Sequence, residues 1–379
     1  MIVRYPEYFS RFSCLASECP DTCCRGWEIQ IDRKTLERYK SETGFLKEKL
    51  GRWVDFQTGS LKFQNGICPF LEQGLCSLQK ERGEQMLCRT CRRYPRHTEE
   101  YGKRREYSLS FSCPAAAKLL VCQDTPIRFI EKAVPGKARP EEEVETELLE
   151  MLAQIRQTAI RISQNRSVSL EWRMSVVLAM CRDIQRRMGK FENRPRLSEI
   201  PGILEKYEFG LDSQNPVLLE KLEKCRFDRK EQQKKISRWM DILFELRPVE
   251  RHWERLLLQL LENMRQERKR KDSQKPERYE HILVSYLDLY LLGAVYDDDL
   301  FTKAEMAVFH CFMLQRMETY LEESLPKLLY LYGREIEHSK ENLEYLEKRL
   351  ASEGQKGFWD MIGCILPAAD DNKGENCLI

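Results

Sequence analysis

Apolar residues recur at helical spacing through almost all of the chain after residue 145. In the first such run they occupy one helix face, at Leu148, Leu149, Leu152, Ile155, Ile160 and Ile162. A second run follows Ser169, and further amphipathic runs cover residues 228–245, 249–270, 277–296, 303–332 and 338–351. Pro248, Pro276 and Pro326 punctuate these runs, since proline disrupts a helix interior. The pattern predicts an α-helical bundle.

The first third of the chain has a different pattern, with short stretches in which apolar and polar residues alternate. These stretches lie at 27–32, 60–66 and 105–112 and predict short strands. Helices are predicted after Asp32, as an N-cap, and from Pro114. A Pro- and Gly-containing segment at 133–143 is typical of a linker. We therefore expect a mainly α protein, with a small cysteine-rich domain at 1–132 and an α-helical domain at 141–379.

Composition narrows the class of protein. The chain has 379 residues, 42% of them hydrophobic and 33% charged, which indicates a globular protein. Its formal net charge of +2 does not indicate a nucleic-acid partner. Arg4 and Glu7 lie where a signal peptide would be apolar, and Asp288 interrupts the longest apolar stretch. We expect a cytoplasmic protein that binds neither nucleic acid nor membranes.

Fifteen cysteines are present, and ten of them precede residue 123. In a reducing compartment, closely spaced cysteines more often bind metal than form disulfides, so we expect the N-terminal domain to be metal-stapled. Cys23 and Cys24 are adjacent and cannot both reach one small ion from an extended backbone, which favours two neighbouring centres or a polynuclear cluster. The spacing leaves both zinc and iron–sulfur open, and the scarcity of histidine slightly favours iron–sulfur.

Four segments together resemble the flagellin lysine-N-methylase family. They are FSCLASECPDTCCRGWEIQID, CPFLEQGLCSLQ, CRRYPR and SLSFSCPAAAKLLV, all within residues 1–125. The resemblance implies that eight thiols are metal ligands: Cys14, Cys19, Cys23, Cys24, Cys68, Cys76, Cys91 and Cys113. Cys88 is an additional thiol with no assigned role, and Cys122 is expected in the core of the following helix.

The same resemblance implies methyl transfer from S-adenosylmethionine to lysines of flagellin, the expected protein partner, with an iron–sulfur cluster involved. We expect a 4Fe-4S cluster, with zinc as the alternative. No G-x-G occurs in the chain, so a doubly wound S-adenosylmethionine domain is not expected. The donor could instead be chelated at an iron with an open coordination position.

Outside the cysteines, the sequence offers few candidates for catalytic or substrate-binding residues. Tyr94 is the nearest candidate for a proton acceptor or cation–π partner, while no catalytic base and no donor-binding residue can be named. Asp297, Asp298 and Asp299 fit a helix N-terminus better than an acidic rim for lysine. Two alternative functions remain open: a non-catalytic zinc-stapled interaction scaffold and an iron–sulfur redox protein.

Overall fold

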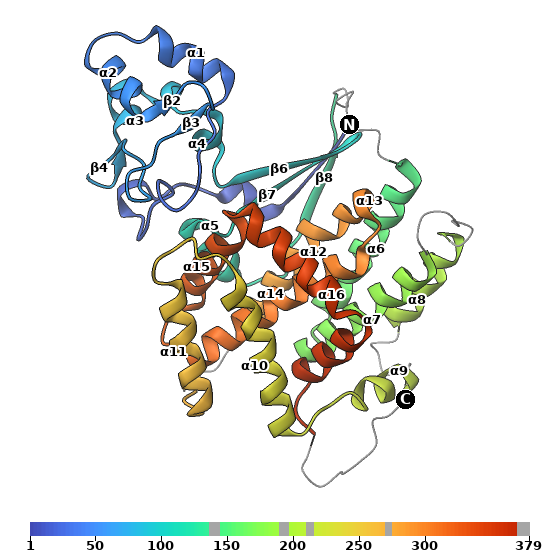
Figure 1. Cartoon of the computed structure of the whole chain (residues 1–379). Coiled ribbons are helices and arrows are strands. Elements are labelled where there is room, and N and C mark those ends of the chain that lie inside the picture. The colour runs from blue at the N-terminus through green and yellow to red at the C-terminus, as the bar shows by residue number, and fades with distance from the viewer. Residues whose placement is uncertain (136–144, 189–196, 210–215, 270–274, 370–379) are drawn as a thin grey trace.

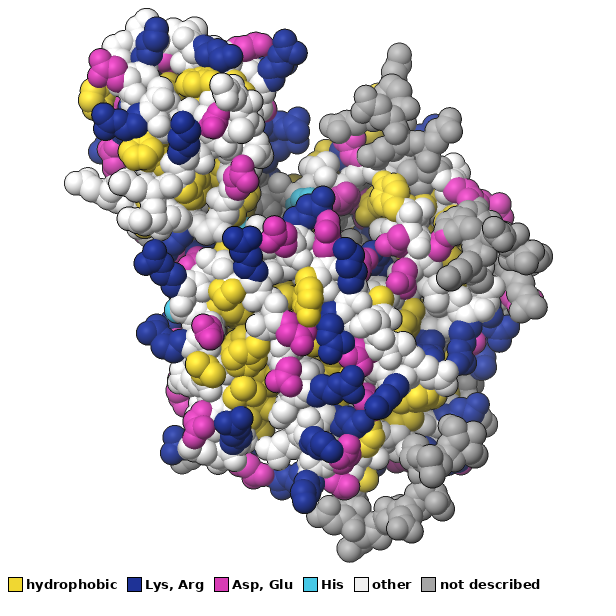
Figure 2. Space-filling model, viewed as in Figure 1, with side chains coloured by type: hydrophobic (Ala, Val, Ile, Leu, Met, Phe, Trp, Pro, Cys, Tyr) yellow, Lys and Arg dark blue, Asp and Glu magenta, His cyan; other side chains and the backbone are white. Residues whose placement is uncertain are grey.

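A bundle of long helices forms most of the molecule, and a smaller lobe of short elements lies at one end of it (Figure 1). The computed structural model describes residues 1–135, 145–188, 197–209, 216–269 and 275–369. Lys and Arg side chains are interspersed with Asp and Glu over the face seen in Figure 2, in keeping with the small net charge. Within the described segments, no helix is both long and apolar enough to cross a lipid bilayer.

Helix α14 (Leu300–Tyr320) lies at the centre of the bundle. Most of its residues are buried, around its whole circumference, as expected for a helix that other helices surround. Its most extensive contacts are with four helices, namely α7 (Leu170–Met188), α12 (Pro276–Tyr290), α15 (Leu325–Glu337) and α16 (Lys340–Ile365). The remaining helices of the bundle are α6 (Thr146–Gln164), α8 (Ile200–Phe209), α9 (Pro216–Glu223), α10 (Arg229–Glu245), α11 (Trp253–Arg265) and α13 (Ala294–Asp297).

A four-stranded sheet joins the bundle to the lobe. Its order is β6 (Arg96–Tyr101), β7 (Arg104–Leu109), β1 (Ile2–Pro6) and β8 (Phe129–Ala133). Strand β1 is parallel to β7, with Val3 opposite Arg105, and antiparallel to β8, with Val3 opposite Lys132. Helix α5 (Pro114–Val121) follows β7 and packs against α12 and α15, so the sheet and α5 share the core of the bundle.

Buried ion pairs fasten this sheet to the helices. Arg156 of α6 donates to both carboxylate oxygens of Glu106 on β7, at 2.6 and 2.7 Å. Arg4 of β1 pairs with Asp288 of α12. All four side chains are almost completely buried, so each charge depends on its partner for solvation.

The lobe has its own small core, formed by buried residues between Ile29 and Cys88. Its helices are α1 (Arg33–Ser41), α2 (Gly44–Trp53), α3 (Ser77–Arg82) and α4 (Arg89–Arg93), and its strand pairs are β2 (Val54–Asp55) with β3 (Ser60–Leu61) and β4 (Leu71–Glu72) with β5 (Leu75–Cys76). Two of the buried residues of this core are cysteines, Cys68 and Cys88. So few apolar residues give a lobe of this size little stability from packing alone.

The mainly helical architecture and the short N-terminal strands are confirmed. Asp32 caps α1 by accepting a hydrogen bond from the Thr35 amide at 3.2 Å, and α5 begins at Pro114 as predicted. The strand predicted at 27–32 is wrong, because only Gln30 forms a bridge there, and the one at 60–66 reduces to β3. The run at 303–332 is two helices, α14 and α15. The division into domains at 1–132 and 141–379 stays a prediction, and most of the proposed linker lies outside the described residues.

Candidate functional site

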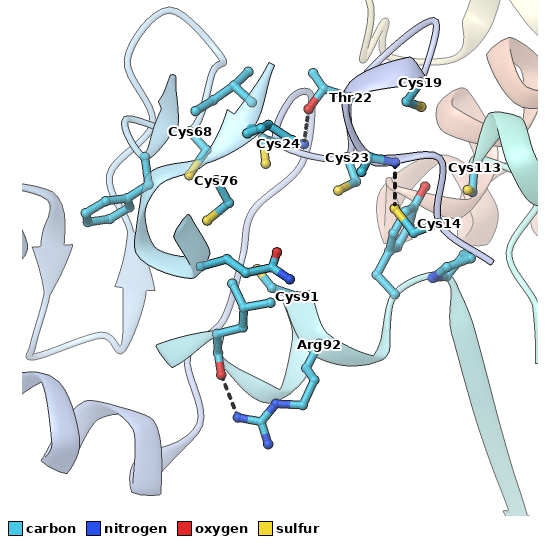
Figure 3. Close-up of a pocket in the computed structure, with 18 of the residues that line it drawn as sticks. Cys14, Cys19, Thr22, Cys23, Cys24, Cys68, Cys76, Cys91, Arg92 and Cys113 are labelled. Atoms are coloured by element: carbon cyan, nitrogen blue, oxygen red, sulfur yellow. Dashed lines mark hydrogen bonds between the residues drawn. The ribbon is translucent and has the colours of Figure 1, made fainter. Parts of the chain in front are cut away.

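A cavity of about 400 Å³ opens where the lobe meets helix α5, and cysteines dominate its lining. Nine thiols line it: Cys14, Cys19, Cys23, Cys24, Cys68, Cys76, Cys88, Cys91 and Cys113. They come from three regions of the chain, which the lobe and the β7–α5 connection bring together (Figure 3). All eight cysteines predicted as ligands are among them. Cys88, left without a role by the sequence, lies there too and is 2% exposed.

The thiols fall into two sets. In Figure 3, Cys24, Cys68 and Cys76 lie together inside the lobe, whereas Cys14, Cys19 and Cys113 lie toward the bundle, with Cys23 between the sets. A backbone hydrogen bond from Cys68 to the Cys24 carbonyl (2.8 Å) holds the lobe set.

Short hydrogen bonds and burial set the acidity of these thiols. Hydrogen bonds from Cys23 and then Cys68 lower the pKa of Cys24. A hydrogen bond from Cys91 lowers the pKa of Cys88 to about 7, while burial raises that of Cys113 to about 11. The same hydrogen bonds raise the pKa of Cys23, Cys68 and Cys91, so among these thiols only Cys24 and Cys88 ionise more readily than an ordinary cysteine. Thiolate is the form that binds metal.

The donor set fits a sulfur-ligated centre in its chemistry, because every described cysteine is a free thiol and thiolates suit both zinc and iron–sulfur clusters. In the segments that the structure describes, however, no three Cys, His, Asp or Glu side chains are arranged as a ready-made metal site. Ligation by the eight cysteines therefore stays a prediction.

Other cysteines lie apart from the cavity. Cys122 is exposed at the C-terminal end of α5, so the expectation that it belongs to the core is wrong. It follows the last turn of the helix, where the side chain leaves the buried face. Cys181 and Cys311 are fully buried in α7 and α14.

Arg334 of α15 connects the cavity wall to the bundle, a role that no sequence pattern indicated. Its guanidinium is fully buried and lies 2.8 Å from Asp21 and 2.9 Å from Glu250. It also donates to the Thr22 carbonyl at 2.8 Å, in the short segment between Cys19 and Cys23. One arginine thus fixes the loop that carries two of the thiols.

Aromatic rings form a further part of the wall. The rings of Trp27 and Tyr94 both line the cavity, with centroids 5.4 Å apart, and His338 stacks on Trp27 at 4.9 Å. The Tyr94 hydroxyl lies 3.0 Å from the Ser112 hydroxyl, and burial raises its pKa well above the usual value. Tyr94 therefore lies in the candidate site, as the sequence suggested.

The aspartates at 297–299 behave as a helix start. Asp299 caps α14 by accepting from the Thr302 amide at 2.9 Å, and Asp297 pairs with Lys303 at 2.7 Å. None of the three lines the thiol cavity. The helix-terminus interpretation accounts for them.

Comparison with known proteins gives consistent relatives. Residues 156–366 match the family of the FliB lysine N-methylase C-terminal domain. A lysine-N-methylase of Salmonella typhimurium is 30% identical over 145 residues, 35% of either chain, so the match spans about a third of that relative. The flagellar biosynthetic protein FliU of Salmonella muenchen is 32% identical over 125 residues, which are 30% of this chain and 72% of that protein. No solved structure matches the chain.

Proposed function

The chain belongs to the FliB lysine N-methylase family, and on that premise we propose that it methylates lysine side chains of a flagellar protein, namely flagellin, in the cytoplasm. S-adenosylmethionine is the proposed methyl donor, and activity depends on an iron–sulfur centre. The observation that carries the proposal is the convergence of nine thiols on one cavity, whose lining includes the rings of Trp27 and Tyr94, beside helix α15 of the family-matched region.

Eight thiols would hold the metal in two sets of four. One set is Cys24, Cys68, Cys76 and Cys91, and the other is Cys14, Cys19, Cys23 and Cys113. This division assigns the adjacent Cys23 and Cys24 to different sets, and the hydrogen bond between their thiols would place the two sets side by side. An iron–sulfur centre, when bound, supplies electron transfer or a coordination position for the amino and carboxylate groups of the donor.

The remaining lining suits a lysine side chain. Only the neutral amine can accept a methyl group by polar displacement, and a free lysine has a pKa of about 10.4. Apolar surroundings disfavour the ammonium and lower that pKa. Trp27 and Tyr94 supply such surroundings, and their ring faces can hold the methylated ammonium by cation–π contact.

The test is methylation of flagellin by purified protein, measured by mass spectrometry. The protein is purified without oxygen and analysed for iron, zinc and sulfide, and it is then incubated with S-adenosylmethionine before and after iron removal. We expect methyl masses only with the iron-loaded form. Equal methylation by both forms would remove the cluster from the mechanism. Zinc alone without methylation would favour the scaffold, and a reversibly reduced cluster without methylation would favour a redox protein.

Cysteine variants test the ligand assignment. Cys24→Ser and Cys91→Ser should each lower the metal content, because each removes one thiolate of the lobe set. Cys122→Ser, exposed and outside the cavity, is the matched control and should keep full metal content. Full metal content in both cavity variants would show that the assignment is wrong.

A further inference from the structure

Two of the family-like segments contain polar residues that metal ligation leaves unexplained. Tyr94 belongs to CRRYPR, and Ser110 and Ser112 belong to SLSFSCP. In the structure their hydroxyl groups form one continuous chain. The Tyr94 hydroxyl is 3.0 Å from Ser112 Oγ, Ser112 Oγ is hydrogen-bonded to Ser110 Oγ, and Ser110 Oγ donates to Oε2 of Glu337 at the end of α15.

We propose that this chain is a proton relay, which carries the proton of the substrate lysine from Tyr94 in the cavity through Ser112 and Ser110 to the carboxylate of Glu337. The inference rests on the proposed function, because that function supplies the lysine. It names Glu337 as the final proton acceptor, whereas the sequence alone indicated only Tyr94 and no catalytic base.

The transfer balances along the chain. The Nζ–H bond of the lysine ammonium breaks, and its proton binds the Tyr94 oxygen while the Tyr94 proton moves to Ser112 Oγ. The Ser112 proton moves to Ser110 Oγ, and the Ser110 proton moves to Oε2 of Glu337. Each hydroxyl gives one proton and takes one. Only the ends change charge: the ammonium becomes a neutral amine, and the carboxylate becomes a neutral acid.

The surroundings of Glu337 suit an acceptor. Burial raises the pKa of its carboxyl group to about 7, although the hydrogen bond from Ser110, the charge of His97 and backbone amides counteract the shift. A carboxylate of that pKa is largely ionised just above neutral pH and is a far stronger base than an exposed glutamate. Its other oxygen, Oε1, has no hydrogen-bond partner in the described part of the chain, so it adds no fixed donor that would oppose protonation.

Groups on three neighbouring elements face Glu337. They are Tyr8 of the 3₁₀ turn Glu7–Arg11, Tyr286 and Tyr290 of α12, and His97 of β6. Burial raises the pKa of each of the three tyrosines, which therefore stay neutral. The side chain of His97 is 49% exposed and pairs with Glu99.

Gly333 allows the relay to form. A Cβ atom on this residue would lie 2.8 Å from the Ser112 amide nitrogen and 3.0 Å from the Phe111 carbonyl carbon. Only a residue without a side chain lets α15 approach the Ser110–Cys113 segment so closely, and that approach brings Glu337 to Ser110.

The test compares Glu337→Gln and Ser110→Ala with a matched control, Glu335→Gln, in the flagellin assay. Glu335 is a neighbouring buried glutamate whose pKa is also raised to about 7, but its carboxylate accepts from the Val249 and Glu250 amides, away from the cavity. In the wild type, the rate should fall about tenfold per pH unit below about pH 7, because Glu337 must be ionised to accept the proton. Glu337→Gln and Ser110→Ala should each lower kcat by about 100-fold and remove that pH step, with unchanged metal content. Glu335→Gln should keep the step.

A wild-type pH profile in Glu337→Gln would overturn the relay, whereas absence of methylation by the wild type would overturn the proposed function itself. A second measurement needs no activity: infrared titration of the carboxylic-acid band. Three results together support the relay. The band titrates near pH 7 in the wild type, it is missing in Glu337→Gln, and its titration moves to higher pH in Ser110→Ala. A Glu337 carboxyl group that titrates near 4.5 overturns it.

Discussion

Replacing Arg334 with methionine should loosen the thiol-bearing loop and destabilise the whole protein. The substitution keeps a long side chain but leaves Asp21 and Glu250, whose side chains are 10% and 7% exposed, without their shared cation. Removing one partner of a buried ion pair typically costs about 3–5 kcal/mol when the remaining charge stays buried and unpaired. This applies to Glu250, whereas Asp21 keeps its second partner, Arg25, at 2.7 Å. The lost hydrogen bond to the Thr22 carbonyl (2.8 Å) adds to this cost.

The assay is urea and thermal unfolding of the iron-free protein, together with reaction of its thiols with a colorimetric reagent. At roughly 2–4 °C per kcal/mol for large domains, the loss corresponds to a fall in Tm on the order of 10 °C. We also expect faster modification of Cys19 and Cys23, which flank the released segment. Arg33→Met is the control, because the Arg33–Glu37 pair is solvent-exposed and contributes about 0–1 kcal/mol.

A double variant separates charge from packing. If the cost arises from unpaired carboxylates, then Glu250→Gln in the Arg334→Met background should recover part of the lost stability. A loss no larger than that of Arg33→Met, with unchanged thiol reactivity, would refute the assignment of Arg334 as the anchor of the loop.

Two further predictions concern the core. Burial lowers the pKa of His310 to about 3, so below pH 6.5 the histidine binds a proton in the unfolded chain but not in the folded protein. The stability of the wild type relative to His310→Gln, measured by urea unfolding, should therefore fall by about 2 kcal/mol between pH 7 and pH 5. An unchanged difference would contradict the burial of His310. Gly333→Ala should lower the free energy of unfolding by about 1–3 kcal/mol in the same assay, because the added Cβ would contact backbone atoms. The control is Gly51→Ala in α2, which has open space around it and should be neutral or stabilising. Equal effects of the two substitutions would contradict the close approach of α15.

Local signals made part of this structure predictable. The helical runs and the Asp32 cap follow from short-range patterns, because helices and their caps are encoded within a few turns of chain. The set of cysteines that the cavity brings together was implied by the family resemblance. Strand β1 was not predicted, because five residues carry little periodicity and its partners lie 100 and more residues away. Arg334 and Glu337 were missed for a similar reason. On a helix, a buried arginine and a buried glutamate look like ordinary surface charges until the facing loops are known.

The central position of β1 also governs when the cavity can form during synthesis. Residues Ile2–Pro6 find their neighbours only after Arg104–Leu109 and Phe129–Ala133 have been made. At about 5–20 residues per second, this delay is on the order of 10 s after the first residues leave the ribosome. Until then no sheet holds Cys14, Cys19 and Cys23 close to Cys113. The nascent chain must therefore carry reactive thiols for that interval, and a metal centre that includes Cys113 can be loaded only after the sheet has closed.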